Sequence, residues 1–236
     1  MIIVDCQQGT PEWLAARAGV ITASNFRVAR SKKSDGSMTE AAEDLAFKLA
    51  LERMSGVPLD DDAPETWQMK RGQRLEPEAR LRHEAEIGVR VKPVGIILSD
   101  DRKFGASADG WIGDDGGAEY KCLVSPKELR AIYIRNDPAK YVDQVMGNLW
   151  LSGRRWWDFC VYCPALETHD LDFYRQRMKR DEESIERMIA ELLQFDSVVE
   201  RNRVTLLRRQ AARNGCRYEP QSDDEARILA ELDMPF

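Results

Sequence analysis

The sequence predicts an α/β fold in which a mixed central β-sheet is flanked by helices. Apolar residues recur at helical spacing in much of the first 87 residues, and the period then changes to that of strands over residues 89–123. From residue 126 to residue 203, helical and strand-like segments alternate. A sheet with helices packed against it is the assembly that buries the apolar faces of both kinds of element.

The helices expected before the sheet are residues 10–17, a second helix capped by Thr22, residues 39–54 and about 65–87. Thr10 and Pro11 are typical of an N-cap and a first helical residue. Gly56 is typical of a residue that ends a helix. Pro77 predicts either a kink in the fourth helix or a fresh first turn.

Strands are expected over residues 89–98, 104–111, 118–123, 156–163 and 169–174. Further helices are expected at about 126–134, 139–152 and 181–203. The glycine-rich segment 113–117 is typical of a hairpin turn, so the strands on either side of it should be neighbours.

The length of 236 residues suffices for one full-sized domain, which we place at residues 1–205, followed by a charged, partly mobile tail at 206–236. Five cysteines with irregular spacing indicate reduced thiols rather than a disulfide framework. Because we find no basic signal-peptide region and no apolar run that could span a bilayer, we expect a protein of the bacterial or phage-infected cytoplasm with no membrane partner. The net charge of −6 argues against a general nucleic-acid binder but allows an enzyme that concentrates carboxylates.

Three charged residues surround the predicted hairpin. Asp109 ends one expected strand, and Glu119 and Lys121 lie two positions apart on the next, so their side chains project from one face. This combination suits phosphodiester hydrolysis, because carboxylates bind Mg²⁺ and a lysine can orient the attacking water. The pattern alone fits a surface hairpin with ordinary charges equally well. The apolar neighbours on the strand favour a site, since inward charges are costly unless they are paired or bind a metal.

Two other groups are weaker candidates for metal binding. Cys160 and Cys163 are three apart on an expected strand and would face opposite sides, which favours buried structural thiols over ligands of an iron–sulfur cluster. His83 and His169 are too isolated for a zinc site.

Four motifs, spread in order over residues 7–175, resemble those of a known family. They are Gln8–Trp13 with Arg17 and residues 19–24, then residues 71–80, then the hairpin of Asp109, Glu119 and Lys121, and finally residues 141–145 with Trp150. The hairpin resembles the PD-(D/E)XK nuclease signature in the form seen in lambda exonuclease and the YqaJ-like viral recombinases. Ala108 stands where that signature has proline, a departure that leaves the carboxylates in place. The resemblance implies a restriction-endonuclease-like core.

The resemblance also implies a set of metal ligands. Asp109 and Glu119 would bind the metal with their carboxylates, and Tyr120 with its main-chain carbonyl. Glu76 would approach the metals from its helix.

Four further residues acquire roles from the resemblance. Lys121 would contact the attacking water, and Gln144 would line the site near the nucleophile or the scissile phosphate. Arg17 and Ser24 match residues that grip a 5′ phosphate. Without the family, a surface arginine and a capping serine would be the simpler interpretation of this pair.

The activity implied is two-metal hydrolysis with Mg²⁺, or with Mn²⁺ in its place, by a 5′-to-3′ exonuclease acting on double-stranded DNA in phage-type recombination. The implied partners are double-stranded DNA ends, a single-strand annealing protein and further copies of the chain in a ring-shaped homotrimer. The alternatives are a structure-specific or helicase-associated endonuclease on the same scaffold, or a non-catalytic module that binds DNA ends or protein. Residues 232–236 resemble the acidic Pro-Phe tip of bacterial single-stranded DNA-binding proteins, and we hypothesise that they recruit a partner or compete for one.

Overall fold

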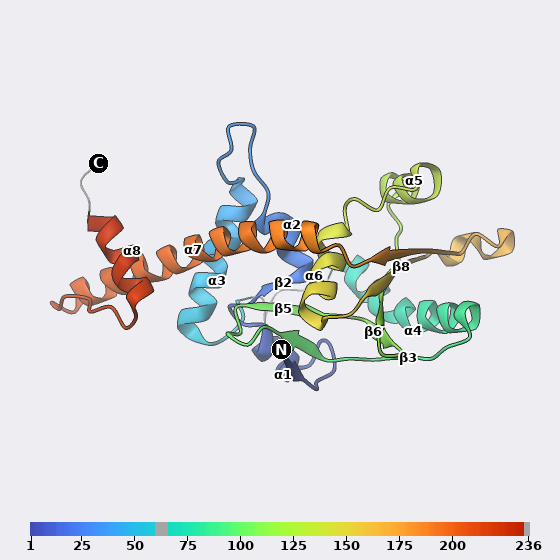
Figure 1. Cartoon of the computed structure of the whole chain (residues 1–236), viewed down its shortest axis with the longest axis horizontal. Helices are drawn as coiled ribbons and strands as arrows, with labels where there is room; N and C mark the ends of the chain where they lie inside the picture. Colours follow the sequence, from blue (N-terminus) through green and yellow to red (C-terminus); the bar gives the residue numbers. More distant parts are fainter. Residues whose placement is uncertain (60–65, 234–236) are drawn as a thin grey trace.

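The computed structural model describes residues 1–59 and 66–233 and has the predicted α/β class, with mixed sheets flanked by helices (Figure 1). The strands are β1 (Ile2–Val4), β2 (Ile21–Thr22), β3 (Val91–Lys92), β4 (Ile96–Leu98), β5 (Phe104–Ser107), β6 (Gly110–Ile112), β7 (Gly116–Lys121), β8 (Trp156–Tyr162) and β9 (Phe173–Lys179). They form two sheets, one with the order β1-β4-β5-β2 and one with the order β3-β6-β7-β8-β9. Each sheet contains one parallel pair, β2 with β5 and β7 with β8.

The α-helices are α1 (Pro11–Arg17), α2 (Phe26–Ala29), α3 (Glu40–Ser55), α4 (Trp67–Ile87), α5 (Pro126–Arg135), α6 (Val142–Ser152), α7 (Glu182–Arg213) and α8 (Asp223–Asp233). Two 3₁₀ helices, η1 (Ala23–Asn25) and η2 (Pro164–His169), complete the described elements. The Thr10 hydroxyl accepts a hydrogen bond from the N–H of Trp13 at 3.4 Å, as expected of an N-cap. Gly56 ends α3 in the left-handed conformation, also as predicted. Pro77 does not divide α4, which runs as one helix.

Two predicted strands, 89–98 and 104–111, are wrong in the same way. Each is divided into two strands that belong to different sheets, β3 and β4 in the first case and β5 and β6 in the second. Near the first division a Cβ on Gly95 would lie 1.9 Å from the carbonyl oxygen of Val4, so β1 comes too close for a larger residue. Asp109 therefore lies where the chain crosses between the sheets, rather than at the end of a continuous strand.

The C-terminal elements lie later in the chain than predicted. The strand expected at 169–174 is β9, which begins later, at Phe173, because η2 occupies residues up to His169. Helix α7 continues ten residues beyond its expected end at Arg203. Helix α8 packs on the far end of α7, where Ile228 is buried and Arg201 pairs with Glu231 at 2.8 Å (Figure 1). The division at residue 205 and the mobility of the tail stay predictions, and the tip residues 234–236 lie outside the described part of the chain.

Helices cover both faces of the five-stranded sheet. Leu75 of α4 shares a buried cluster with Tyr120 of β7, whereas Val145 of α6 shares a different cluster with Phe159 of β8. Because side chains alternate along a strand, Glu119 points to the α6 side of the sheet. None of the helices in the described ranges is both long and apolar enough to cross a membrane.

Candidate active site

The predicted hairpin brings Asp109 and Glu119 together. Strands β6 and β7 pair in an antiparallel register that sets Gly110 opposite Ala118, which places the crossover residue Asp109 beside Glu119. The Asp109 carboxylate accepts a hydrogen bond from the N–H of Tyr120 at 2.6 Å. Asp109 is 9% exposed and Glu119 is 2% exposed, so both carboxylates are nearly removed from water.

Three nitrogen donors hold the Glu119 carboxylate. Its Oε1 accepts from Lys121 Nζ at 2.7 Å and from Gln144 Nε2 at 2.6 Å. Its Oε2 accepts from Asn148 Nδ2 at 3.1 Å. The structure thus brings Lys121 and Gln144 to the site, as the motifs predicted. Asn148 was not predicted, although its place one helical turn after Gln144 was a signal that the two share a face.

Glu76 reaches the same site from α4, and Arg80 connects it to Asp109. Arg80 Nη2 lies 2.7 Å from Glu76 Oε1 and also donates to the carbonyl oxygen of Asp109 at 3.3 Å. Burial raises the pKa of Glu76 despite the opposing charge of Arg80, and the negative charge of Glu119 adds to this effect. Arg80 is a second site residue that sequence reasoning missed, although it stands one turn after Glu76.

The site concentrates negative charge. Burial raises the pKa of Asp109 well above its ordinary value, and the charges of Glu119 and Glu76 raise it further. Burial alone would lower the pKa of Lys121, but the neighbouring Glu119 and Asp109 carboxylates raise it above its ordinary value. Lys121 therefore stays a cation beside carboxylates that repel one another.

This donor set fits a hard divalent cation. Mg²⁺ and Mn²⁺ prefer oxygen ligands, and a cation would relieve the repulsion that raises the pKa of Asp109. Within residues 1–59 and 66–233, no three His, Cys, Asp or Glu side chains are arranged to hold a metal by themselves. A cation here would consequently need main-chain carbonyl and water oxygens beside the carboxylates.

Arg17 and Ser24 form a second polar group through Thr22. The Arg17 guanidinium lies over the Trp13 ring at 4.0 Å and donates from Nη2 to Thr22 Oγ1 at 3.3 Å. Thr22 Oγ1 lies 3.1 Å from Ser24 Oγ and accepts from Asn25 Nδ2 at 3.4 Å. Thr22 stands at the predicted N-cap position, before the 3₁₀ turn η1 that leads into α2, but its hydroxyl makes no capping hydrogen bond. Its buried hydroxyl instead connects the two predicted phosphate-binding residues.

The two polar groups are connected through β5 and α6. Trp13 Nε1 donates to Ser107 Oγ at 2.9 Å, two residues before Asp109. On α6, a Cβ added at Gly147 would lie 2.6 Å from Phe26, so α6 packs tightly beside the segment that carries Ser24. The carboxylates and the Arg17 group therefore belong to one continuous region of the molecule.

A buried hydrogen-bond network supports β7 on the α4 side of the sheet. His83 of α4 lies 2.9 Å from the Tyr120 hydroxyl through Nδ1 and 3.2 Å from Asp158 Oδ2 through Nε2. Arg177 donates to both carboxylate oxygens of Asp158 at 2.8 Å. The five cysteines are all free, and Cys160 is buried beside this network, in agreement with a structural thiol.

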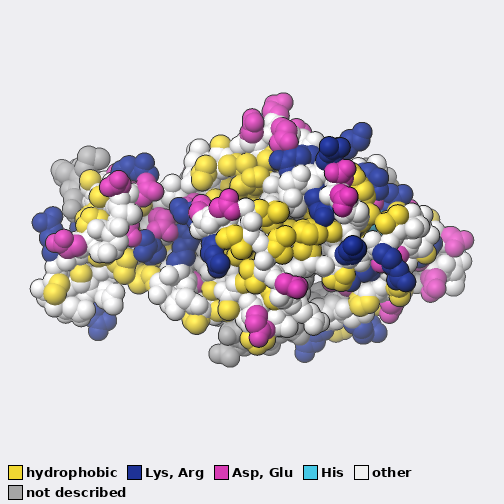
Figure 2. Space-filling model, turned by 60° about the horizontal axis from the view of Figure 1, so that its bottom comes forward, with side chains coloured by type: hydrophobic (Ala, Val, Ile, Leu, Met, Phe, Trp, Pro, Cys, Tyr) yellow, Lys and Arg dark blue, Asp and Glu magenta, His cyan; other side chains and the backbone are white. Residues whose placement is uncertain are grey.

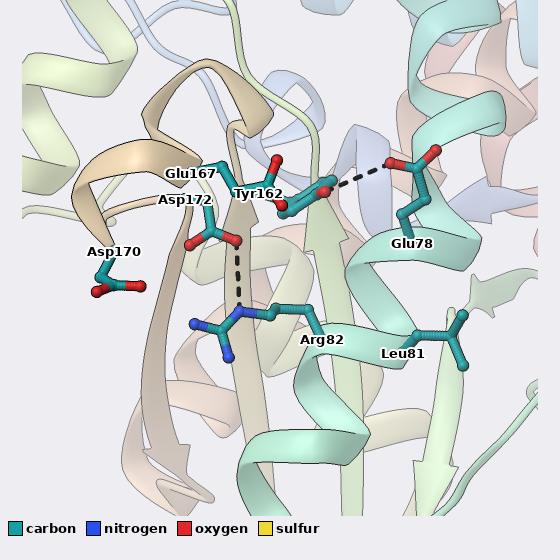
Figure 3. Close-up of a pocket in the computed structure, with 7 residues that line it drawn as sticks. All are labelled: Glu78, Leu81, Arg82, Tyr162, Glu167, Asp170 and Asp172. Atoms are coloured by element: carbon teal, nitrogen blue, oxygen red, sulfur yellow. Dashed lines mark hydrogen bonds and ion pairs between the residues drawn. The ribbon is translucent and has the colours of Figure 1, made fainter.

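A pocket of about 590 Å³ lies on the other side of α4 (Figure 3). Its lining residues Glu78 and Arg82 stand two positions after Glu76 and Arg80, which places them on the opposite face of the helix. Arg82 Nε lies 3.3 Å from Asp172 Oδ2 across the pocket. The pocket is thus separate from the site formed by Asp109, Glu119 and Glu76.

Comparisons with known proteins agree with this geometry. The model of the YqaJ-like viral recombinase domain matches residues 12–155. The crystal structure of the alkaline exonuclease LHK-Exo from Laribacter hongkongensis is 32% identical, covers 87% of this chain and 100% of its own, and has a TM-score of 0.74. LHK-Exo in complex with dAMP has 30% identity, the same coverage and a TM-score of 0.75. A phage-related exonuclease from Haemophilus somnus 129PT shares the fold, with a TM-score of 0.62 and 12% identity. The match covers 81% of this chain and 96% of that protein. No curated protein matches the chain.

Proposed function

Because the chain belongs to the YqaJ-like viral recombinase family, as its motifs predicted, and is a nuclease, we propose that it removes nucleotides from the 5′ ends of double-stranded DNA with Mg²⁺ or Mn²⁺. The observation that carries the proposal is the buried group of Asp109, Glu119 and Lys121, with Glu76 beside it. LHK-Exo was crystallised with dAMP, the kind of product that an exonuclease releases, and this supports a mononucleotide product here.

The carboxylates would hold the metal ions. We assign this role to Asp109, Glu119, Glu76 and the main-chain carbonyl of Tyr120. When bound, the metals supply polarisation of the phosphoryl oxygens and a more acidic water. The charge of Lys121, which its carboxylate neighbours maintain, suits it to orient the attacking water and to offset the growing negative charge of the phosphate.

The direction of digestion would come from the Arg17 group. A guanidinium can donate two parallel hydrogen bonds to a phosphate, and the Thr22 and Ser24 hydroxyls beside it provide further donors. A 5′ phosphate bound there would keep the terminal nucleotide close to the carboxylates, because both groups lie against α6 and β5. This arrangement supports a preference for 5′-phosphorylated ends.

The wider assignment follows from the family. We propose that the enzyme works in the cytoplasm, encircles DNA as a homotrimer and leaves a 3′ overhang for a single-strand annealing protein. The net charge of −6 does not oppose contact with DNA, because Figure 2 shows Lys and Arg side chains in separate local groups on one face.

Digestion of a linear duplex tests the proposal. The duplex carries 5′ phosphates and a label at one end at a time, and it is incubated with Mg²⁺ or with EDTA beside a closed circular duplex. We expect metal-dependent loss from the 5′ end and intact circles. Internal cuts in the circle would instead identify an endonuclease on this scaffold, and binding without cleavage would identify a non-catalytic DNA-end-binding module.

A further inference from the structure

Asn148 contacts the candidate metal site but has no role in the proposed chemistry. Its side chain is fully buried on α6, and its Nδ2 donates to Glu119 Oε2. Its Oδ1 is also buried and has no hydrogen-bond partner among the described residues. A buried amide oxygen without a partner reduces stability, so the amide at this position carries a cost that its hydrogen bond to the buried Glu119 carboxylate offsets. The contact with Glu119 is therefore the feature that accounts for an amide at this position.

We infer that Asn148 is a positioning residue that fixes the Glu119 carboxylate in the orientation that binds metal, an inference that rests on the proposed function. Lys121 and Gln144 both donate to Oε1, so the contact from Asn148 is the one that holds Oε2 among the described side chains. A carboxylate held at one oxygen can still turn about its last side-chain torsion, which is a soft one. A donor on the second oxygen fixes the plane of the group.

The neutrality of the amide is part of this role. Lys121 brings a positive charge to Glu119 and so reduces its attraction for a cation. Asn148 orients the second oxygen without adding charge, which leaves the carboxylate negative toward a metal. Outer groups that orient ligands in this way typically change metal affinity or activity by about 10–100-fold when they are removed.

The test replaces the amide by an apolar side chain with the same branching, Asn148→Leu, in the full chain. Mn²⁺ binding to the DNA-free protein is measured by isothermal titration calorimetry, and the Mg²⁺ midpoint of cleavage is measured separately. We expect Mn²⁺ to bind about 10–100-fold more weakly and the Mg²⁺ midpoint to rise by a similar factor, with a smaller loss of rate at saturating Mg²⁺. Ser152→Ala is the matched control. The Ser152 hydroxyl donates to the main-chain oxygen of Asn148 at 2.6 Å, so its loss should leave both midpoints unchanged.

Each outcome decides for or against the role. Unchanged Mn²⁺ affinity in a folded Asn148→Leu protein would overturn it, as would a wild-type protein that binds no Mn²⁺. If circular dichroism shows that the leucine variant is unfolded, Asn148→Ala takes its place with the same expectation. A wild-type protein that binds Mn²⁺ but does not cleave DNA would refute the proposed function, while the Mn²⁺ titrations would still decide the role of Asn148.

Discussion

The replacement Asp158→Asn should destabilise the protein in a way that depends on pH. Asp158 has no exposed side-chain surface and receives hydrogen bonds from Arg177 and His83. Burial alone would raise the pKa of this carboxyl, but these hydrogen bonds and the arginine charges lower it from 3.8 to about 2. This fall corresponds to about 2 kcal/mol of stability at neutral pH. Because the Arg177 side chain is 42% exposed and water weakens the pair, we expect a loss of about 1–2 kcal/mol.

The sign of the pH dependence follows from the lowered pKa. The stabilisation is complete above the pKa of the unfolded chain and disappears as the pH falls through that of the folded protein, so about half should remain at pH 3. Urea unfolding of wild type and Asp158→Asn at pH 7, 4 and 3 measures this difference. Asp44→Asn, at an exposed position of α3, controls for the general effect of removing a charge. An equal difference at pH 7 and pH 3 would refute the electrostatic reasoning and assign the whole effect to packing.

Three further changes test the site. Asp109→Asn should reduce the rate of cleavage by about 10³-fold or more, because it removes a charged metal ligand. Filter binding should show a DNA affinity within about threefold of wild type. Near-normal turnover would mean that the active site lies elsewhere. Arg17→Ala should reduce the preference for 5′-phosphate over 5′-hydroxyl ends by about tenfold or more in competition digests, because a charge-assisted hydrogen bond is lost. The control Arg90→Ala should leave this preference unchanged. An equal preference in both variants would mean that Arg17 does not bind the 5′ phosphate. Gly147→Val should cost about 1–3 kcal/mol and lower the melting temperature, because the new Cβ would lie 2.6 Å from Phe26; unchanged melting would show that α6 has room to move.

The hairpin could be predicted from the sequence because its geometry is local. A glycine-rich turn and the alternation along β7 are sufficient to place Asp109, Glu119 and Lys121 together. The Thr10 cap of α1 was predictable for the same reason, since the capping hydroxyl and the N–H from which it accepts lie three residues apart.

The parts that escaped prediction depend on contacts between distant segments. Asn148 is 29 residues from Glu119, and Thr22 connects two predicted residues with a buried hydroxyl that looked like an ordinary cap. The division of the segment 104–111 between two sheets is set by strands that are far away in the sequence, so its strand-like periodicity appeared continuous.

The crossover at Asp109 has a consequence for the size of the product. Thr22 of the proposed phosphate grip lies on β2 in one sheet, and Glu119 lies on β7 in the other. On the proposed function, the distance between Thr22 on one sheet and Glu119 on the other sets how many nucleotides lie between the bound 5′ phosphate and the bond that is cleaved. A substitution that shifts one sheet against the other would therefore change the length of the released fragment, and not the rate of cleavage alone.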